Sequence, residues 1–120
     1  QHYEYRPTGP QILGGGTEAV VEGYIKERVP LARLTPASLL GRVDAYWPAI
    51  FSVESQMRPA ATVSFMAEFL RDPSTLDPSA PFFYRARAVA LTGGYSVEMR
   101  ELWLDDEPVV LNQQVFAILG

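Results

Sequence analysis

The sequence predicts an α+β domain in which one helix packs against an antiparallel sheet of about five strands. A single stretch with helical periodicity follows Thr35-Pro36. Residues 60–70 alternate between apolar and polar side chains with a period of two, which is typical of a half-buried strand. Two further long apolar stretches are joined by Gly93-Gly94, a pair that favours a tight hairpin turn. Together these patterns indicate one helix followed by sequential antiparallel strands.

The composition limits the size of the fold and its partners. With 120 residues, of which 48% are hydrophobic, the chain can bury one compact core and is too short for two ordinary domains. The formal net charge is -4 and the pI is about 4.9. An acidic surface repels nucleic acids and anionic membranes, so we expect neither as a partner. Small molecules and other proteins are the expected partners.

Several chemistries are excluded by the residues that are absent. The chain has no cysteine, which excludes disulfides, thiolate nucleophiles and cysteine metal ligands, and its one histidine, His2, lies in the N-terminal tail. We therefore expect no metal and no bound cofactor. No apolar run approaches the roughly 18 residues of a spanning helix, and the first residues do not resemble a secretion signal. A cytoplasmic location is expected, and the first residue, Gln1, suggests a fragment or a processed chain.

The N-terminal part is expected to lead into the domain without regular structure. Residues 1–16 contain two prolines and end in three glycines, so we interpret them as an extended lead-in or linker. Residues 17–28 alternate loosely and contain β-branched and aromatic side chains, which indicates the first strand. The single domain is thus predicted over residues 17–120.

A helix of about three turns is predicted to begin at Thr35, because a threonine N-cap followed by Pro36 is a typical helix start. Pro48 should end it. Its apolar stripe is expected to contain Leu40, Val43, Trp47 and Ile50. Asp44 lies just beyond the edge of this stripe and is the only carboxylate on the helix. Since a charge beside a packed surface costs free energy unless it is partnered or exposed, Asp44 is a candidate functional residue.

The strands that follow carry the other candidate residues. In residues 60–70, alternation places Val63, Phe65, Ala67 and Phe69 on one face and Thr62, Ser64, Met66 and Glu68 on the other. A proline-rich loop over 71–81 precedes strands at 82–92, 95–105 and 109–119. Around the Gly93-Gly94 turn, regular pairing predicts a core face formed by Ala86, Ala88, Ala90, Val97, Met99 and Trp103. The opposite face would carry Arg85, Arg87, Glu98 and Arg100.

One helix enclosed by such a sheet is the hotdog arrangement, and the chain resembles the C-terminal half of a TesB-like double-hotdog acyl-CoA thioesterase. The similarity covers nearly the whole chain and depends on the order and spacing of several segments. These are YEYR, GYI, VDAYWPAIF, TVSFMAEFLR, GGYSVEMRELWLDD and QQVFAIL. The chain departs from the family where many members have an Asp-His pair, because Ser64 and Phe65 stand there, while Phe69 and Arg71 match.

The resemblance implies a mechanism and a set of site residues. In that family a helix Asp, a strand Thr or Ser and a Gln of the last strand orient the water that attacks a thioester, and these roles would fall on Asp44, Thr62 and Gln114. The substrate would be a coenzyme A thioester, in fatty acid metabolism. A carboxylate can act as general base, while a hydroxyl and a carboxamide hold the water in place.

Cationic side chains are candidates for binding the phosphates of coenzyme A. They are Arg71, Arg85, Arg87 and Arg100. Like charges that face each other across strands are unfavourable without an anion. A solvated face balanced by Glu98 is the alternative.

Each catalytic candidate also has a structural interpretation. Asp44 can be an exposed residue or an acceptor for a backbone donor, and Gln114, which follows Asn112 and Gln113, can belong to an exposed polar edge. Thr62 lies on the strand face opposite Phe65, so a bulge or a subunit interface is needed to bring it toward Asp44.

The family places two hotdog units in one chain, and this sequence supplies one. We therefore expect a homodimer or higher oligomer, or pairing with a missing N-terminal half. The alternative function is a non-catalytic acyl-binding or dimerisation unit. Hotdog dehydratases generally need an active-site histidine, for which His2 is a poor substitute.

Overall fold

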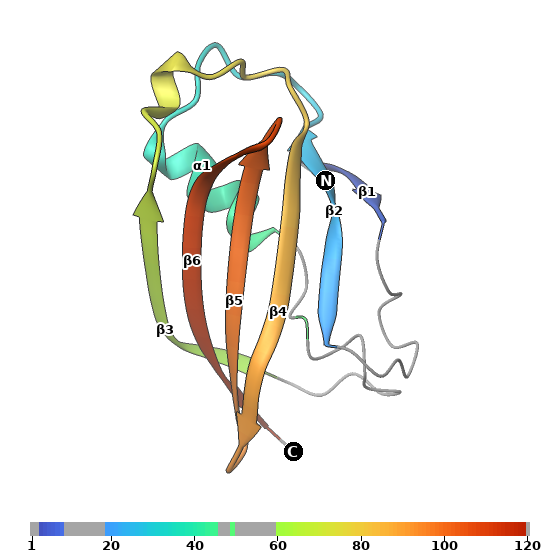
Figure 1. Ribbon diagram of the computed structural model, residues 1–120, viewed down its shortest axis with the longest axis vertical. Helices are drawn as coiled ribbons and strands as arrows, with labels where there is room; N and C mark the ends of the chain where they lie inside the picture. Colours follow the sequence, from blue (N-terminus) through green and yellow to red (C-terminus); the bar gives the residue numbers. More distant parts are fainter. Residues whose placement is uncertain (1–2, 9–18, 46–48, 50–59, 120) are drawn as a thin grey trace.

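The computed structural model describes residues 3–8, 19–45, 49 and 60–119, and these form one six-stranded antiparallel sheet with one α-helix (Figure 1). The elements are β1 (Tyr3–Pro7), β2 (Val20–Glu27), α1 (Pro36–Asp44), β3 (Ala60–Phe69), a 3-10 turn (Pro73–Thr75), β4 (Phe82–Thr92), β5 (Tyr95–Leu104) and β6 (Glu107–Ile118). The strand order is β1-β2-β4-β5-β6-β3. The predicted α+β class is confirmed, with six strands in place of about five.

The two faces of the sheet differ in what they contact. Helix α1 crosses behind the sheet in Figure 1 and lies against β5 and β6, and we call the face that it covers the inner face. The core between helix and sheet consists mainly of aliphatic and aromatic side chains. They include Val21, Ile25, Leu39, Val43, Phe82, Tyr84, Leu102 and Val110. Burying each of the larger side chains contributes about 1.5–3 kcal/mol, which makes this layer the main source of stability.

The expectation that residues 1–16 lack regular structure is wrong for β1. Tyr3–Pro7 pairs with β2, and Tyr3 and Tyr5 pack against the core. The hydroxyl of Tyr5 donates a hydrogen bond to the carbonyl oxygen of Ala45, at 3.2 Å. The two tyrosines alternate with polar residues, and Pro7 stands at the end of an edge strand, where a proline is tolerated. Residues 9–18, which contain the glycines, lie outside the described residues.

Helix α1 begins as predicted and ends earlier than predicted. The Ser38 backbone N–H donates to Thr35 Oγ1 at 3.1 Å and the Thr35 N–H donates to Ser38 Oγ at 2.8 Å, a reciprocal capping box, with Pro36 in the first turn. The helix spans nine residues and ends at Asp44, so it is shorter than three turns. The buried positions are Leu39, Arg42 and Val43, so the stripe is rotated from the predicted one.

In that predicted stripe, Leu40 is half-buried rather than core. Trp47, Pro48 and Ile50 lie outside the described residues.

The hairpin between β4 and β5 forms at Gly93-Gly94, but the predicted core face of β5 is wrong. Both glycines have positive φ angles, 58° and 81°, as a type I′ turn requires. The register shifts between Ala88 and Ala90, so that Ala88 pairs with Glu98 and Ala86 with Arg100. A bulge inserts one residue and therefore exchanges the two faces beyond it.

The consequence is that Glu98 and Arg100 lie on the inner face. Val97, Met99 and Trp103, which were predicted to form the core, lie on the outer face and are at least partly exposed.

The loop before β4 is folded by its own side chains. Asp72 Oδ1 accepts hydrogen bonds from Ser74, and Asp77 Oδ1 accepts them from Ser79. These hydrogen bonds lower the pKa of both aspartates. Because each aspartate is followed by a proline that fixes the next φ angle, the loop over 71–81 is a pair of turns.

Candidate active site

A polar cluster lies on the inner face of the sheet, beneath the C-terminal end of α1. It consists of Glu98 and Arg100 from β5 and Asn112 and Gln114 from β6, and all four side chains are buried. The register pairs Glu98 with Gln114 and Arg100 with Asn112. Polar and charged groups are costly to bury unless they are hydrogen-bonded, so this cluster is a candidate site.

Asp44, the last residue of α1, contacts this cluster. Its Oδ1 accepts a hydrogen bond from Gln114 Nε2 at 3.3 Å and lies 3.6 Å from Arg100 Nη1. Its side chain is 61% exposed, so one side of the carboxylate contacts the cluster and the other is open. The structure thus brings together Asp44 and Gln114, which are separated by 70 residues in sequence.

The hydrogen bonds around Gln114 determine how its amide is oriented. Asn112 Nδ2 donates to the carbonyl oxygen of Met66 at 2.6 Å, which leaves Asn112 Oδ1 to accept from Gln114 Nε2 at 2.8 Å. Both donors of the Gln114 amide are therefore used, one by Asn112 and one by Asp44. Its Oε1 is buried and accepts no hydrogen bond from the described residues. A buried acceptor without a partner, next to an open carboxylate, can accept a hydrogen bond from a water or a substrate group.

Thr62 lies on the same face of the sheet as Gln114, contrary to the face predicted from alternation. The register between β3 and β6 shifts between Thr62 and Ser64, so that Thr62 pairs with Phe116 while Phe65 pairs with Gln114. Directly paired residues share a face, and Phe116 and Gln114 both lie on the inner one. Within the described part of the chain, Thr62 makes no hydrogen bond to Asp44 or Gln114. The Thr62–Phe116 pair lies two pairs along the strands from the Phe65–Gln114 pair.

The predicted cluster of phosphate-binding arginines is wrong for Arg100. Arg100 is buried beneath α1, whereas Arg85 and Arg87 lie on the outer face, because of the bulge in β4. Arg85 Nε is paired with Glu22 Oε2 at 3.0 Å. Arg71 Nη1 lies 3.3 Å from Glu107 Oε2. The arginines therefore do not converge on one site.

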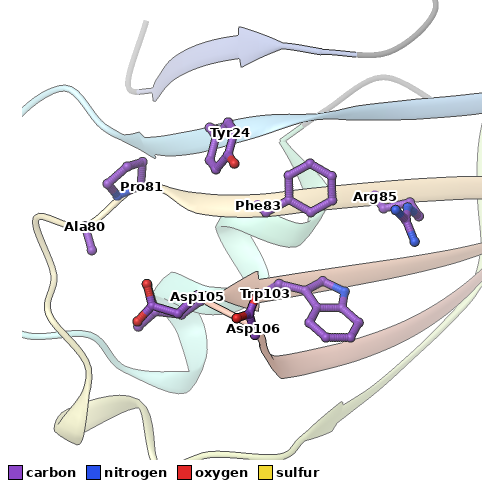
Figure 2. Close-up of a pocket in the computed structure, with 9 residues that line it drawn as sticks. Tyr24, Ala80, Pro81, Phe83, Arg85, Trp103, Asp105 and Asp106 are labelled. Carbon is purple, nitrogen blue, oxygen red and sulfur yellow. The ribbon is translucent and has the colours of Figure 1, made fainter.

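The outer face carries a pocket of about 610 Å³, which Figure 2 shows. Tyr24, Phe83 and Trp103 form a row across three neighbouring strands, and Arg85 and the Asp105-Asp106 turn complete its lining. A second pocket, of about 570 Å³, adjoins it at Arg85. Neither contains Asp44 or Gln114. The inner-face cluster is the stronger candidate, because it combines an exposed carboxylate with a buried amide oxygen that has no partner among the described residues.

The described part of the chain contains neither a metal-ligand cluster nor a membrane-spanning helix. Over residues 3–8, 19–45, 49 and 60–119, no group of three or more His, Cys, Asp or Glu side chains could hold a metal ion. In the same part of the chain, α1 is the only α-helix, and it is far too short to cross a bilayer.

An antiparallel sheet wrapped against one helix defines a hotdog-type domain. The model of the acyl-CoA thioesterase C-terminal domain family matches residues 1–118, and the chain belongs to this family. The predicted resemblance is confirmed, and the chain is a thioesterase-family domain. No curated protein matches the sequence significantly.

Solved structures show the same fold. A protein of unknown function with a hot dog fold from Alicyclobacillus acidocaldarius has a TM-score of 0.89 and 23% identity, over 100% of this chain and 46% of the other. A TesB protein of Mycobacterium avium subspecies paratuberculosis has a TM-score of 0.74 and 17% identity, over 100% of this chain and 49% of the other.

A conserved protein from Pseudomonas aeruginosa has a TM-score of 0.65 and 18% identity, over 96% of this chain and 88% of the other. The chain thus spans about half the length of the first two relatives and most of the third.

Two buried residues of the cluster were not among the predicted site residues. Asn112 was noted only as part of a run of three amides, and Glu98 was assigned to the exposed face. Asn112 could have been found from the sequence, because it lies two residues before Gln114 and residues two apart share one face of a strand. Glu98 could be found only by locating the bulge.

Proposed function

We propose that this domain hydrolyses an acyl-CoA thioester with a water molecule that Asp44 activates. The observation that carries the proposal is the contact between Asp44 Oδ1 and Gln114 Nε2. Gln114 Oε1, on the same amide, has no hydrogen-bond partner among the described residues. Asp44 Oδ2 accepts no hydrogen bond from the described residues, so one carboxylate oxygen is available as a general base. The family membership supplies the reaction class.

In the proposed reaction, Gln114 Oε1 accepts a hydrogen bond from the attacking water and Asp44 Oδ2 takes its other proton. The water oxygen attacks the carbonyl carbon, and the carbon–sulfur bond then breaks. The thiolate of coenzyme A leaves with the proton that Asp44 received, so the products are a carboxylic acid and a free thiol. Asp44 and Gln114 would contribute by position and by proton transfer, without a covalent intermediate.

Thr62 is proposed to complete the site from β3. Its place on the inner face, two pairs along the strands from Gln114, supports a role in holding the water or the thioester. The exposed Thr62 side chain leaves room for a substrate on this side.

A non-catalytic unit that binds an acyl group or dimerises is the second candidate. It is favoured by the exposed edge strand β3 and by the fact that the chain spans about half of a TesB relative. On this alternative a second hotdog unit would complete the site.

Release of free thiol from acyl-CoA esters of several chain lengths separates the two candidates. The hydrolase proposal predicts turnover of at least one ester, with equal amounts of acid and thiol. Binding of acyl-CoA without release from any ester would favour the non-catalytic unit.

A further inference from the structure

Glu98 and Arg100 form a buried ion pair directly beneath the end of α1. Arg100 Nε donates to Glu98 Oε2 at 2.5 Å, and the side chains are 1% and 0% exposed. The Arg100 guanidinium also lies over the rings of Tyr84 and Phe116, at 5.9 and 5.6 Å from their centroids. Burial by itself disfavours the charged form, but interactions with Tyr84, Glu98 and Asp44 outweigh it and raise the pKa of Arg100. Arg100 is therefore a fixed cation inside the domain.

This ion pair connects β5 to the segment that carries Asp44 through hydrogen bonds. Arg100 Nη1 donates to the carbonyl oxygen of Val43 at 2.9 Å and lies 3.6 Å from Asp44 Oδ1. On its other side, Glu98 Oε1 accepts a hydrogen bond from the Ala49 N–H. The two side chains thus contact the chain just before and just after the end of α1.

Stability alone is a weak reason for a buried ion pair. Removing two charges from water costs several kcal/mol, and replacing such a pair by apolar residues of similar volume is often neutral or stabilising. The contacts of this pair, however, are directed to a carboxylate and to the carbonyl beside it. A charge at 3.6 Å from Oδ1 holds that oxygen toward the sheet.

We propose that Arg100 and Glu98 are positioning residues, which fix the end of α1 so that Asp44 faces Gln114 with one oxygen free. The expected effect of these residues on turnover rests on the proposed hydrolase function. Their effect on the position of Asp44 rests on the contacts described above. Glu98 acts through Arg100, whose guanidinium it orients, and neither residue touches the reacting atoms.

The test is a double variant, Glu98→Leu with Arg100→Met, in the full chain. Because both buried charges are removed together, no buried charge is left unpaired, and the Asp44 carboxylate that loses Arg100 is largely exposed to solvent. The melting temperature should therefore stay within about 5 °C of wild type. We expect kcat for thioester hydrolysis to fall about 10- to 100-fold while KM changes less than about threefold, since misplacement of a catalytic group impairs turnover more than binding. A folded double variant with wild-type kcat would overturn the inference.

A second variant, Arg100→Lys, tests the same point if the double variant does not fold. This variant keeps the buried charge but replaces the planar guanidinium group with one ammonium group, which cannot hydrogen-bond to Glu98 and Val43 in the same geometry. We expect a kcat between those of wild type and the double variant. A wild-type kcat in Arg100→Lys would contradict positioning by the guanidinium group. Glu101→Leu, on the outer face of the same strand, is the matched control and should keep wild-type kcat.

The side-chain amide of Gln114 gives a readout that does not depend on activity. Its ¹H–¹⁵N signals can be assigned by their loss in Gln114→Leu. In wild type, the proton donated to Asp44 should exchange slowly with solvent, and in the double variant this proton alone should exchange faster, at least tenfold. If wild type hydrolyses no thioester, the proposed function fails, and unchanged amide exchange in the double variant would overturn the positioning role separately.

Discussion

A carboxylate at the last residue of a helix interacts unfavourably with the helix dipole, because the C-terminal end of the dipole is negative. Asp44 occupies this position, and its unfavourable interaction is offset by the Arg100 guanidinium at 3.6 Å and the Gln114 amide at 3.3 Å. Both partners come from neighbouring strands and lie on one face of the sheet. The arrangement places the Asp44 carboxylate at the boundary between the buried cluster and solvent.

Gln114→Leu should lower turnover without unfolding the domain. Leucine fills a similar volume but removes the donor to Asp44 and the acceptor proposed for the water, so we expect kcat to fall about 100-fold. Steady-state thiol release measures this, with Gln113→Leu as the control, because Gln113 lies on the exposed face of the same strand. Equal kcat in the two variants would remove Gln114 from the proposed site.

Two strand irregularities determine which side chains reach the inner face. The bulge in β4 brings Glu98 and Arg100 under the helix, and the bulge in β3 brings Thr62 to the side of Gln114. Simple alternation predicted the opposite face for all three residues. Hydrophobic periodicity locates a strand well, but a single inserted residue inverts the pattern beyond it and leaves little trace in composition.

Elements with local signals were predicted more accurately. The Thr35-Pro36 start of α1 and the Gly93-Gly94 turn depend on a few neighbouring residues, and both are confirmed. The early end of α1 at Asp44 has no comparable local signal. The pairing of Asp44 with Gln114 depends on tertiary contacts across 70 residues, and only the family resemblance pointed to it.

Arg42 anchors α1 to the rest of the domain, and its loss should be costly. Its guanidinium pairs with Glu27 Oε1 at 2.5 Å and donates to the carbonyl oxygens of Pro78 and Ala80. Arg42→Ala leaves the largely buried Glu27 carboxylate and both carbonyls unpaired, so the free energy of unfolding should fall by about 3–5 kcal/mol. Urea denaturation measures the change, and the exposed Arg33→Ala should change it by less than about 0.5 kcal/mol. A loss below about 1 kcal/mol in Arg42→Ala would contradict the anchoring role.

At the scale of the whole molecule, β3 lies at one edge of the sheet (Figure 1). It carries exposed apolar side chains. Val63 and Met66 are 59% and 62% exposed, and Phe65 and Phe69 are also exposed. A long apolar edge is a template for pairing with another chain. The chain also spans only about half of the Alicyclobacillus hot dog protein and of the TesB protein. On these two observations we propose that the domain associates with a second hotdog unit, either another copy or another segment.

The chain on its own should therefore associate in solution. We expect sedimentation equilibrium to show a dimer or larger species, and Met66→Lys to weaken the association at least tenfold by placing a charge at the edge. Val89→Lys is the control, because Val89 lies in β4, which is not an edge strand, and it should leave the association unchanged. A monodisperse wild-type monomer would contradict the predicted oligomer.

The central claim is that Asp44 activates the water, and Asp44→Asn tests it most directly. Asparagine keeps the size of the side chain and can still accept from Gln114, but it cannot take a proton. Thiol release from the best acyl-CoA substrate should show a kcat at least about 100-fold below wild type, with KM and melting temperature nearly unchanged. A folded Asp44→Asn protein that hydrolyses the ester at the wild-type rate would contradict the account.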